Sequence, residues 1–214
     1  HMGTLDPQVT GVLPITLGRA CRLSEHFMHK NKTYVGIMRI HEEIEEKKLK
    51  AEIKKFTGKI MQLPPVRSRV KRQLREREIK SFKILEIEDK NVLFETEVEA
   101  GTYIRKLIHD VGEKIGGAHM LELRRTKAGI FDEKTAITLY EFEKAIQEDT
   151  LEKYLVPAEE AIKKILKTVQ ISDKNLKKIL TGKPLMKEDL KGKISEEKFA
   201  AFLGERFIGT YRKV

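Results

Sequence analysis

The chain has 214 residues and a mass of 24.7 kDa, which allows one moderate domain with its own core and a small second domain. Its 43 Lys and Arg residues against 33 Asp and Glu give a formal net charge of +10, which favours a nucleic acid as partner, although high solubility or heat stability produces the same excess. The single cysteine, Cys21, excludes a disulfide within the chain and a zinc site of paired cysteines, and no apolar run reaches the roughly 18 residues of a membrane span, so the sequence predicts a cytoplasmic protein.

The first part of the chain predicts two strands and two helices. Residues 12–17 form a short apolar run typical of a buried strand, and residues 19–28 carry apolar side chains at helical spacing. Residues 33–41 alternate as a strand with two different faces does. Residues 43–56 are rich in Lys and Glu around a sparse apolar stripe, which predicts a surface helix that Gly58 caps.

A basic segment follows Pro64-Pro65 and precedes a predicted hairpin. Its basic side chains are Arg67, Arg69, Lys71, Arg72, Arg75 and Arg77. Such a spacing of positive charges suits contact with a phosphate backbone. Residues 81–87 and 92–98 alternate apolar and polar side chains on either side of Asp89-Lys90-Asn91, which predicts a β-hairpin and an antiparallel sheet.

The remaining elements complete a mixed pattern. Residues 102–115 place apolar side chains on one helical face, with Thr102 as the expected N-cap, and residues 118–126 return as a strand. We therefore expect an α+β fold, with a mixed, mainly antiparallel sheet and flanking helices. A boundary near residue 168 divides a larger domain, residues 1–168, from a small β-rich C-terminal domain, residues 169–214.

Four segments, in order, resemble the motifs of the TruB/dyskerin family of pseudouridine synthases. They are Gly-Thr-Leu-Asp-Pro-Gln-Val-Thr-Gly-Val-Leu-Pro at 3–14, Lys-Thr-Tyr-Val at 32–35, Pro-Pro-Val-Arg-Ser at 64–68 with Lys71, and Glu-Ala-Gly-Thr-Tyr-Ile-Arg at 99–105 running into 117–126. Four ordered motifs with compatible gaps are far more specific than one, and they span roughly residues 1–140. The third and fourth segments are closer to the archaeal dyskerin branch than to bacterial TruB.

The resemblance implies that the chain isomerises uridine to pseudouridine in RNA. The bond from C1′ of the ribose to N1 of uracil breaks, the base turns, and C1′ is joined to C5. No redox change or net hydrolysis occurs, so neither a cofactor nor a metal is required. A carboxylate must be ionised in a site that excludes water, and the resemblance assigns this role to Asp6 and that of its ion-pair partner to Arg105.

The resemblance also implies a set of residues around an extruded nucleotide. Tyr34 matches the residue that stacks on the flipped uracil, and Tyr103 a second active-site tyrosine. Leu123 matches an apolar wall of the uracil pocket, and Lys71 a basic residue beside it. His1 fits the family's Gly-His-x-Gly spacing, although a cloning remnant gives the same residues. The other expected RNA-binding residues are Arg67, Arg72, Arg124 and Arg125.

Taken singly, these residues have structural alternatives. An Asp before Pro is common in turns, and Arg105 has Asp110 and Glu113 on its own helix to pair with. The two tyrosines suit core positions equally well. Arg124 and Arg125 point to opposite faces of their strand, so at most one readily meets the site.

Two departures from the family shape the remaining expectations. The strand and the Lys-Pro-x-Gly-x-Thr-Ser motif that precede the catalytic loop are not in this sequence, so we expect an edge or gap in the sheet, or a segment that another chain supplies. Residues 171–214 resemble a shortened PUA domain, an RNA-binding module. RNA is the expected partner, either tRNA alone or guide RNA plus target RNA with small H/ACA proteins; a non-catalytic scaffold subunit or a basic RNA-binding module is the alternative.

Overall fold

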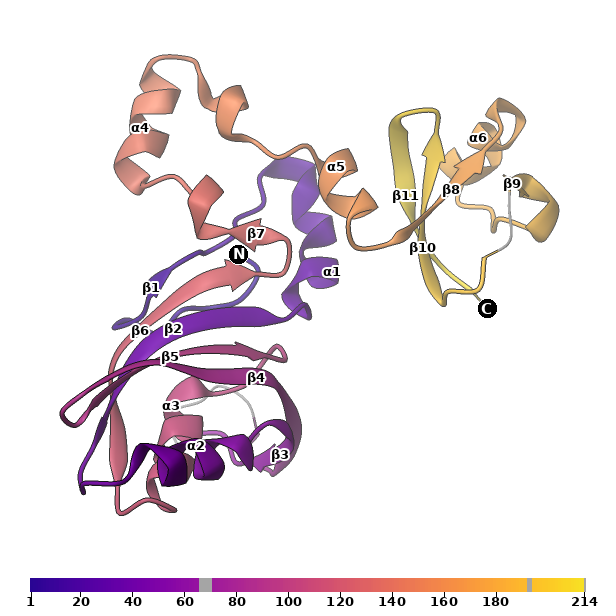
Figure 1. Ribbon diagram of the computed structural model, residues 1–214. Helices are drawn as coiled ribbons and strands as arrows, with labels where there is room; N and C mark the ends of the chain where they lie inside the picture. The colour runs from indigo at the N-terminus through magenta and orange to yellow at the C-terminus, as the bar shows by residue number, and fades with distance from the viewer. Residues whose placement is uncertain (66–70, 192–193, 214) are drawn as a thin grey trace. The chain divides into compact units, whose positions relative to one another are not determined.

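The computed structural model describes residues 1–65, 71–191 and 194–213 (Figure 1). The chain divides into two compact units, His1–Ala136 and Ile137–Val214. The predicted boundary near residue 168 lies inside the second unit, and the division into residues 1–168 and 169–214 stays a prediction. None of the described helices has the length and apolar character needed to cross a lipid bilayer.

The first unit is built on a seven-stranded sheet in the order β1-β6-β2-β5-β4-β3, with β7 paired to β6. The strands are β1 (Thr10–Gly11), β2 (Lys32–Ile40), β3 (Gly58–Gln62), β4 (Arg75–Glu88), β5 (Asn91–Val98), β6 (Ala118–Ala128) and β7 (Phe131–Asp132). The pairing of β1 with β6 is parallel, and the other described pairings are antiparallel. The predicted hairpin is confirmed, because β4 and β5 pair around Asp89-Lys90, where Asp89 has a φ of +51°.

The core of this unit lies between the sheet and two helices, α2 (Glu46–Lys54) and α3 (Ile104–Gly112). The amphipathic pattern explains this burial: α3 contributes its apolar face, and α2 contributes Leu49 and Ile53 from its sparse stripe. Side chains from both helices join Met38 of β2 and Phe94 of β5 in one buried cluster. This packing fixes α3, which carries Arg105, against the sheet.

Three local expectations were wrong. Residues 12–17 have no regular secondary structure, because their contacts come from the tertiary fold: the N–H of Val12 donates to the carbonyl of Arg125, and Pro14 has no N–H for a ladder. The helix expected from Thr102 begins at Ile104, and the Thr102 hydroxyl instead donates to the carbonyl of Glu99. Gly58 is the first residue of β3 rather than a helix cap.

The position of the short helical region before β2, expected at residues 19–28, was predicted correctly. A 3-10 helix over Gly18–Leu23 leads into α1 (Ser24–Met28), where Phe27 is buried. Phe27 packs against Phe131 of β7, with ring centroids 5.6 Å apart. This contact holds the segment after the loop that carries Asp6 against the sheet.

The second unit holds a four-stranded sheet in the order β11-β10-β8-β9. Its elements are α4 (Leu139–Gln147), α5 (Ala158–Lys163), β8 (Lys167–Ile171), α6 (Asp173–Leu180), β9 (Leu190–Lys191), β10 (Lys198–Leu203) and β11 (Arg206–Arg212). The small core comes mainly from β10, where Phe199 to Phe202 are all buried. The expected β-rich C-terminal part is confirmed, and its likeness to a PUA domain stays a prediction.

Gly11 allows β1 to lie directly against β6. It has a φ of +107°, and a Cβ at this position would stand 2.1 Å from the carbonyl oxygen of Arg125. No side chain fits there without moving the backbone. The short parallel pairing, and with it the loop that carries Asp6, therefore depends on this glycine.

We expect Gly11→Ala to lower the free energy of unfolding by about 2–4 kcal/mol, because the new methyl group forces β1 off β6. Gly18→Ala is the matched control. Gly18 also has a positive φ, +54°, but open space around its Cβ position, so we expect a loss of about 1 kcal/mol. Urea unfolding of the two variants measures both values, and equal losses would contradict the role assigned to the close approach.

Candidate active site

A tight turn presents Asp6 at the surface of the first unit. The N–H of Val9 donates to the carbonyl of Asp6 at 2.9 Å, which closes a β-turn over Asp6-Pro7-Gln8-Val9. Pro7 stands at the second position of the turn, where its fixed φ is favourable. The chain then enters β1, so the side chain of Asp6 is held a few residues from the edge of the sheet.

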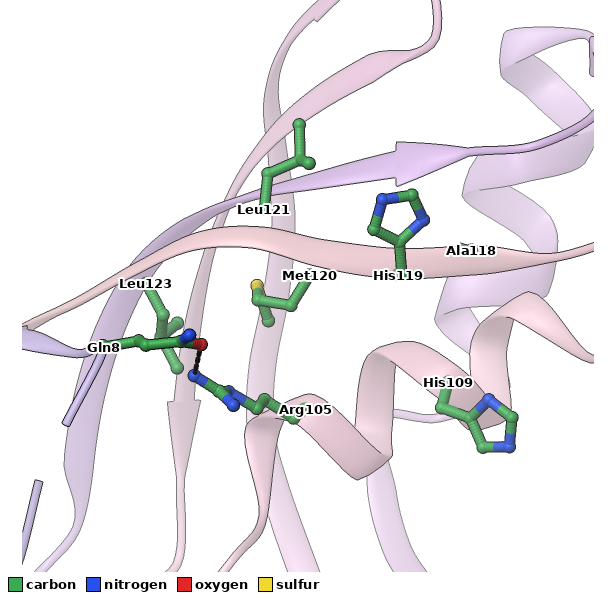
Figure 2. A pocket seen from close by; sticks show the side chains of 8 residues that line it. All are labelled: Gln8, Arg105, His109, Ala118, His119, Met120, Leu121 and Leu123. Carbon is green, nitrogen blue, oxygen red and sulfur yellow. Dashed lines mark hydrogen bonds between the residues drawn. The ribbon is translucent and has the colours of Figure 1, made fainter. Parts of the chain in front are cut away.

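Arg105, in the first turn of α3, faces this turn. Its Nε lies 3.8 Å from Oδ2 of Asp6, and its Nη2 donates to Oε1 of Gln8 at 2.8 Å (Figure 2). The alternative partners on the helix are taken by others, because Asp110 pairs with Lys106 and Glu113 with His109. The structure therefore brings Asp6 and Arg105 together, as the resemblance implied.

A hollow of about 280 Å³ opens beside Arg105. It is lined by Gln8, Arg105, His109, Ala118, His119, Met120, Leu121 and Leu123. Figure 2 shows Gln8 and Arg105 meeting at one end, with Leu123 close by and His119 and Leu121 further along β6. Leu123 is 8% exposed, so it supplies an apolar floor at this end.

Tyr34 lies on β2, and its surroundings keep its hydroxyl protonated. Burial raises the pKa of Tyr34 above its ordinary value of 10, and the negative charge of Asp6 adds to this. Arg125 acts in the opposite direction through its charge and a hydrogen bond to the hydroxyl. At neutral pH the hydroxyl therefore carries no charge, and the partly buried ring packs against the core of the first unit, within range of the charges of Asp6 and Arg125.

Tyr103 precedes α3 and is held by its backbone. Its N–H donates to Oε1 of Gln62 at 3.0 Å, and its carbonyl accepts from Nε2 of the same side chain at 3.2 Å. Gln62, the last residue of β3, is 1% exposed. Sequence reasoning missed Gln62, and its one available signal was a polar residue directly before the apolar Leu63 and Pro64.

Arg125 is buried beneath the loop that carries Asp6, with 1% of its surface exposed. Its guanidinium donates to the carbonyls of Val12 at 2.7 Å, Gly3 at 3.0 Å and Thr4 at 3.4 Å. A buried charge requires such partners, and bonds from a charged donor are strong. Arg125 therefore shapes the loop from inside and does not present its guanidinium at the surface.

The other expected RNA-binding residues that the structure describes lie at the surface. Arg124 points away from Arg125, as the alternation of a strand requires, and its Nε bonds Oε2 of Glu133 at 2.7 Å. Lys71 and Arg72 are exposed in the segment before β4, and His1 is exposed at the start of the chain. Arg67 lies outside the described residues.

Metal ligands do not gather in the part of the chain that the structure describes. Within it, no group of three or more His, Cys, Asp or Glu side chains is placed to hold a metal ion. His26 and His29 have the spacing of a ligand pair, three residues apart. His26 lies in α1 and His29 directly follows it.

Lys32, the first residue of β2, is a second buried cation next to Arg125. Its Nζ donates to the carbonyls of Met28 and Lys30, each at 2.6 Å. Burial, with a smaller contribution from the charge of Arg125, lowers the pKa of Lys32 from 10.5 to about 8. Lys32 is the first residue of the motif at residues 32–35, but no role was expected for it.

The lowered pKa of Lys32 predicts a pH-dependent stability. Between pH 8 and 10.5 the unfolded chain binds a proton at Lys32 that the folded chain does not, so the free energy of unfolding should rise with pH in this window and be level on either side of it. Unfolding of the wild type and of Lys32→Met across pH 7–11 isolates this rise in the difference between the two curves. Parallel curves would contradict the assignment.

Comparison with known proteins agrees with this arrangement. The N-terminal domain of TruB family pseudouridylate synthases matches residues 1–46 and 37–104, and the C-terminal domain of tRNA pseudouridylate synthase B matches residues 105–163. A probable tRNA pseudouridine synthase B of Nanoarchaeum equitans is 43% identical over 190 residues, covering 85% of this chain and 54% of that protein. Its counterpart in Methanothermobacter thermautotrophicus is 42% identical over 200 residues, covering 90% of this chain and 61% of that protein. The chain thus spans between half and two thirds of the length of these curated relatives.

Solved structures give the same result. A Cbf5-Nop10-Gar1 complex contains a chain that superposes with a TM-score of 0.88 at 39% identity, covering 99% of this chain and 68% of that one. An H/ACA RNP bound to a substrate RNA containing 2′-deoxyuridine contains one with a TM-score of 0.85 at 35% identity, covering 98% and 67%. With both domain matches and these identities, the chain belongs to the TruB family of pseudouridine synthases.

Proposed function

We propose that the chain isomerises uridine to pseudouridine in RNA, with Asp6 as its catalytic carboxylate. The observation that carries this proposal is the pairing of Asp6 with Arg105. Oδ2 of Asp6, on an exposed turn, lies 3.8 Å from Nε of Arg105, which lines the hollow. The relatives named as probable tRNA pseudouridine synthases support it. The expectation of a cytoplasmic enzyme belongs to the same proposal and is supported by the single cysteine, which suits a reducing compartment.

The geometry suits the chemistry of this isomerisation. An ionised Asp6 acts on the ribose of the target, either as nucleophile or as the base that starts glycosidic cleavage. The C1′–N1 bond breaks, C1′ bonds to C5, and the proton lost from C5 is balanced by the one gained at N1. Arg105 lies where it can orient the carboxylate. The side chain of Asp6 is 64% exposed, so the bound RNA itself must exclude water from the reaction.

The surroundings of Asp6 suit a nucleotide taken out of its stack. Tyr34 offers a neutral aromatic face for the extruded uracil, and Leu123 offers an apolar wall at the end of the hollow next to Arg105. Tyr103, two residues before Arg105, is proposed as the second tyrosine of the site. His1 is proposed as a contact to the RNA near the displaced base.

Recognition of RNA rests on the positive charge of the chain. We propose Lys71, Arg72 and Arg124 as contacts to phosphates, since all three are exposed, and Arg67 belongs to the same proposal. Arg125 contributes to binding through the shape of the loop. The solved relatives that carry Nop10, Gar1 or a substrate RNA support a particle with guide RNA and small H/ACA proteins as the working form.

Mapping of pseudouridine tests both the activity and its mode. Bare tRNA and a guide RNA with its target are each incubated with the chain, with and without the small H/ACA proteins. Conversion of bare tRNA indicates a stand-alone synthase, and conversion only with guide and partners indicates the particle. Binding of RNA without conversion in every mixture would refute catalysis and leave the scaffold or the RNA-binding module.

We expect Asp6→Asn to abolish turnover and to leave RNA affinity within several-fold, because it removes the reacting carboxylate and keeps the shape of the side chain. Release of tritium from RNA labelled at C5 of uridine measures turnover. Asp149→Asn is the matched control: Asp149 is exposed with a φ of +54°, a conformation that Asn also tolerates. Equal turnover by the Asp6 variant and the wild type would refute the catalytic assignment.

We expect Lys71→Ala with Arg72→Ala to weaken binding of all RNAs alike and to reduce the slope of log affinity against log salt by about 2, because two phosphate contacts are lost. Lys47→Ala with Lys48→Ala on α2 removes the same charge from another exposed surface and serves as the control. Filter binding at several salt concentrations gives both slopes. An equal loss in the control would mean that net charge alone attracts RNA.

A further inference from the structure

We propose that Gln8 is a positioning residue that holds the guanidinium of Arg105 in place opposite Asp6. This inference rests on the proposed function, because it concerns the same acid–guanidinium pair. Gln8 belongs to the motif at residues 3–14, but no role was expected for it. Figure 2 shows its side chain extended toward Arg105 at the end of the hollow.

The contacts of Arg105 divide between two residues of one turn. Nη2 donates to Oε1 of Gln8 at 2.8 Å, while Nε lies 3.8 Å from Oδ2 of Asp6. The guanidinium is planar and its donors have fixed directions, so a bond at Nη2 also sets the direction of Nε. Gln8 thereby determines how the charged group is presented to the carboxylate.

The ion pair alone does not hold Arg105. Its side chain is 45% exposed and that of Asp6 is 64% exposed, and the 3.8 Å separation exceeds hydrogen-bond distance. Such an exposed pair gains little electrostatic energy in water, and holding a long, flexible side chain in one geometry costs conformational entropy. The bond to Gln8 is exposed as well, but it is the shorter of the two contacts and lies within hydrogen-bond distance. Its acceptor is neutral and does not compete with Asp6 for positive charge.

The β-turn couples the two contacts. The bond from the Val9 N–H to the Asp6 carbonyl fixes the backbone between Asp6 and Gln8. Pro7, between them, further limits the conformations available. The backbone positions from which the acceptor and the carboxylate extend therefore keep a constant relation to each other.

A double-mutant cycle tests this inference with the wild type, Gln8→Ala, Arg105→Ala and the double variant. Single-turnover rates at saturating RNA and separate RNA affinities are measured for each. We expect Gln8→Ala to lower the rate about three- to tenfold, the size of one exposed hydrogen bond, and to change affinity less than about twofold. In the Arg105→Ala background the same substitution should have no further effect on rate.

Gln147→Ala is the matched control, since it replaces an exposed glutamine on α4 and should leave rate and affinity unchanged. An equal fall in rate upon Gln8→Ala in both backgrounds would overturn the inference, because Gln8 would then act on RNA or on folding independently of Arg105. A fall in affinity that accounts for the whole effect would overturn it as well.

NMR of the Arg105 Nε–H group tests the positioning without any turnover. We expect this group to be ordered in the wild type, mobile in Gln8→Ala, and ordered again in Gln8→Glu, which keeps an acceptor at the same reach. An equally ordered signal in Gln8→Ala would refute the inference. If the wild type converts no RNA while the NMR pattern holds, the proposed function fails and the positioning role stands.

Discussion

The burial of one guanidinium constrains the whole loop that carries Asp6. Arg125 lies in the interior of the first unit, where an unpaired charge costs several kcal/mol, and its hydrogen bonds go to the carbonyls of Val12, Gly3 and Thr4. The loop must therefore keep these carbonyls where the strand β6 places the guanidinium. Gly11 permits the close approach that this requires, and the turn that presents Asp6 lies between the bonded carbonyls.

Two arginines thus serve the same loop in opposite ways. Arg125 is fully enclosed and bonds backbone atoms, so its contribution is a fixed path for the chain. Arg105 is half exposed and approaches side chains, so its contribution depends on what holds it there. The proposed part played by Gln8 follows from this difference, because Arg125 is oriented by the backbone carbonyls that surround it, while the exposed Arg105 depends on the few side chains that reach it.

The sequence predicted helices and strands correctly where the hydrophobic period was clear. The prediction was wrong where tertiary contacts determine the path of the backbone. The hairpin around Asp89 and the helix that carries Arg105 follow from periods of two and 3.6 residues. Residues 12–17 have the composition of a strand, but their path is set by Arg125 and by Pro14. In the site, ordered motifs indicated Asp6 and Arg105, which the structure brings within 3.8 Å. Gln8 and Gln62 escaped prediction because a glutamine's role depends on what it meets in space.

Gln62 gives the first turn of α3 an anchor from a distant strand. The opening N–H groups of a helix have no partner within it, and helix ends fray first for this reason. Here the amide of a residue at the end of β3 takes both polar groups of the Tyr103 backbone. Loosening the N-terminal end of α3 would leave the buried amide of Gln62 without these partners, which is costly. What would be the softest part of an isolated helix is therefore stiffened at the place from which Arg105 projects.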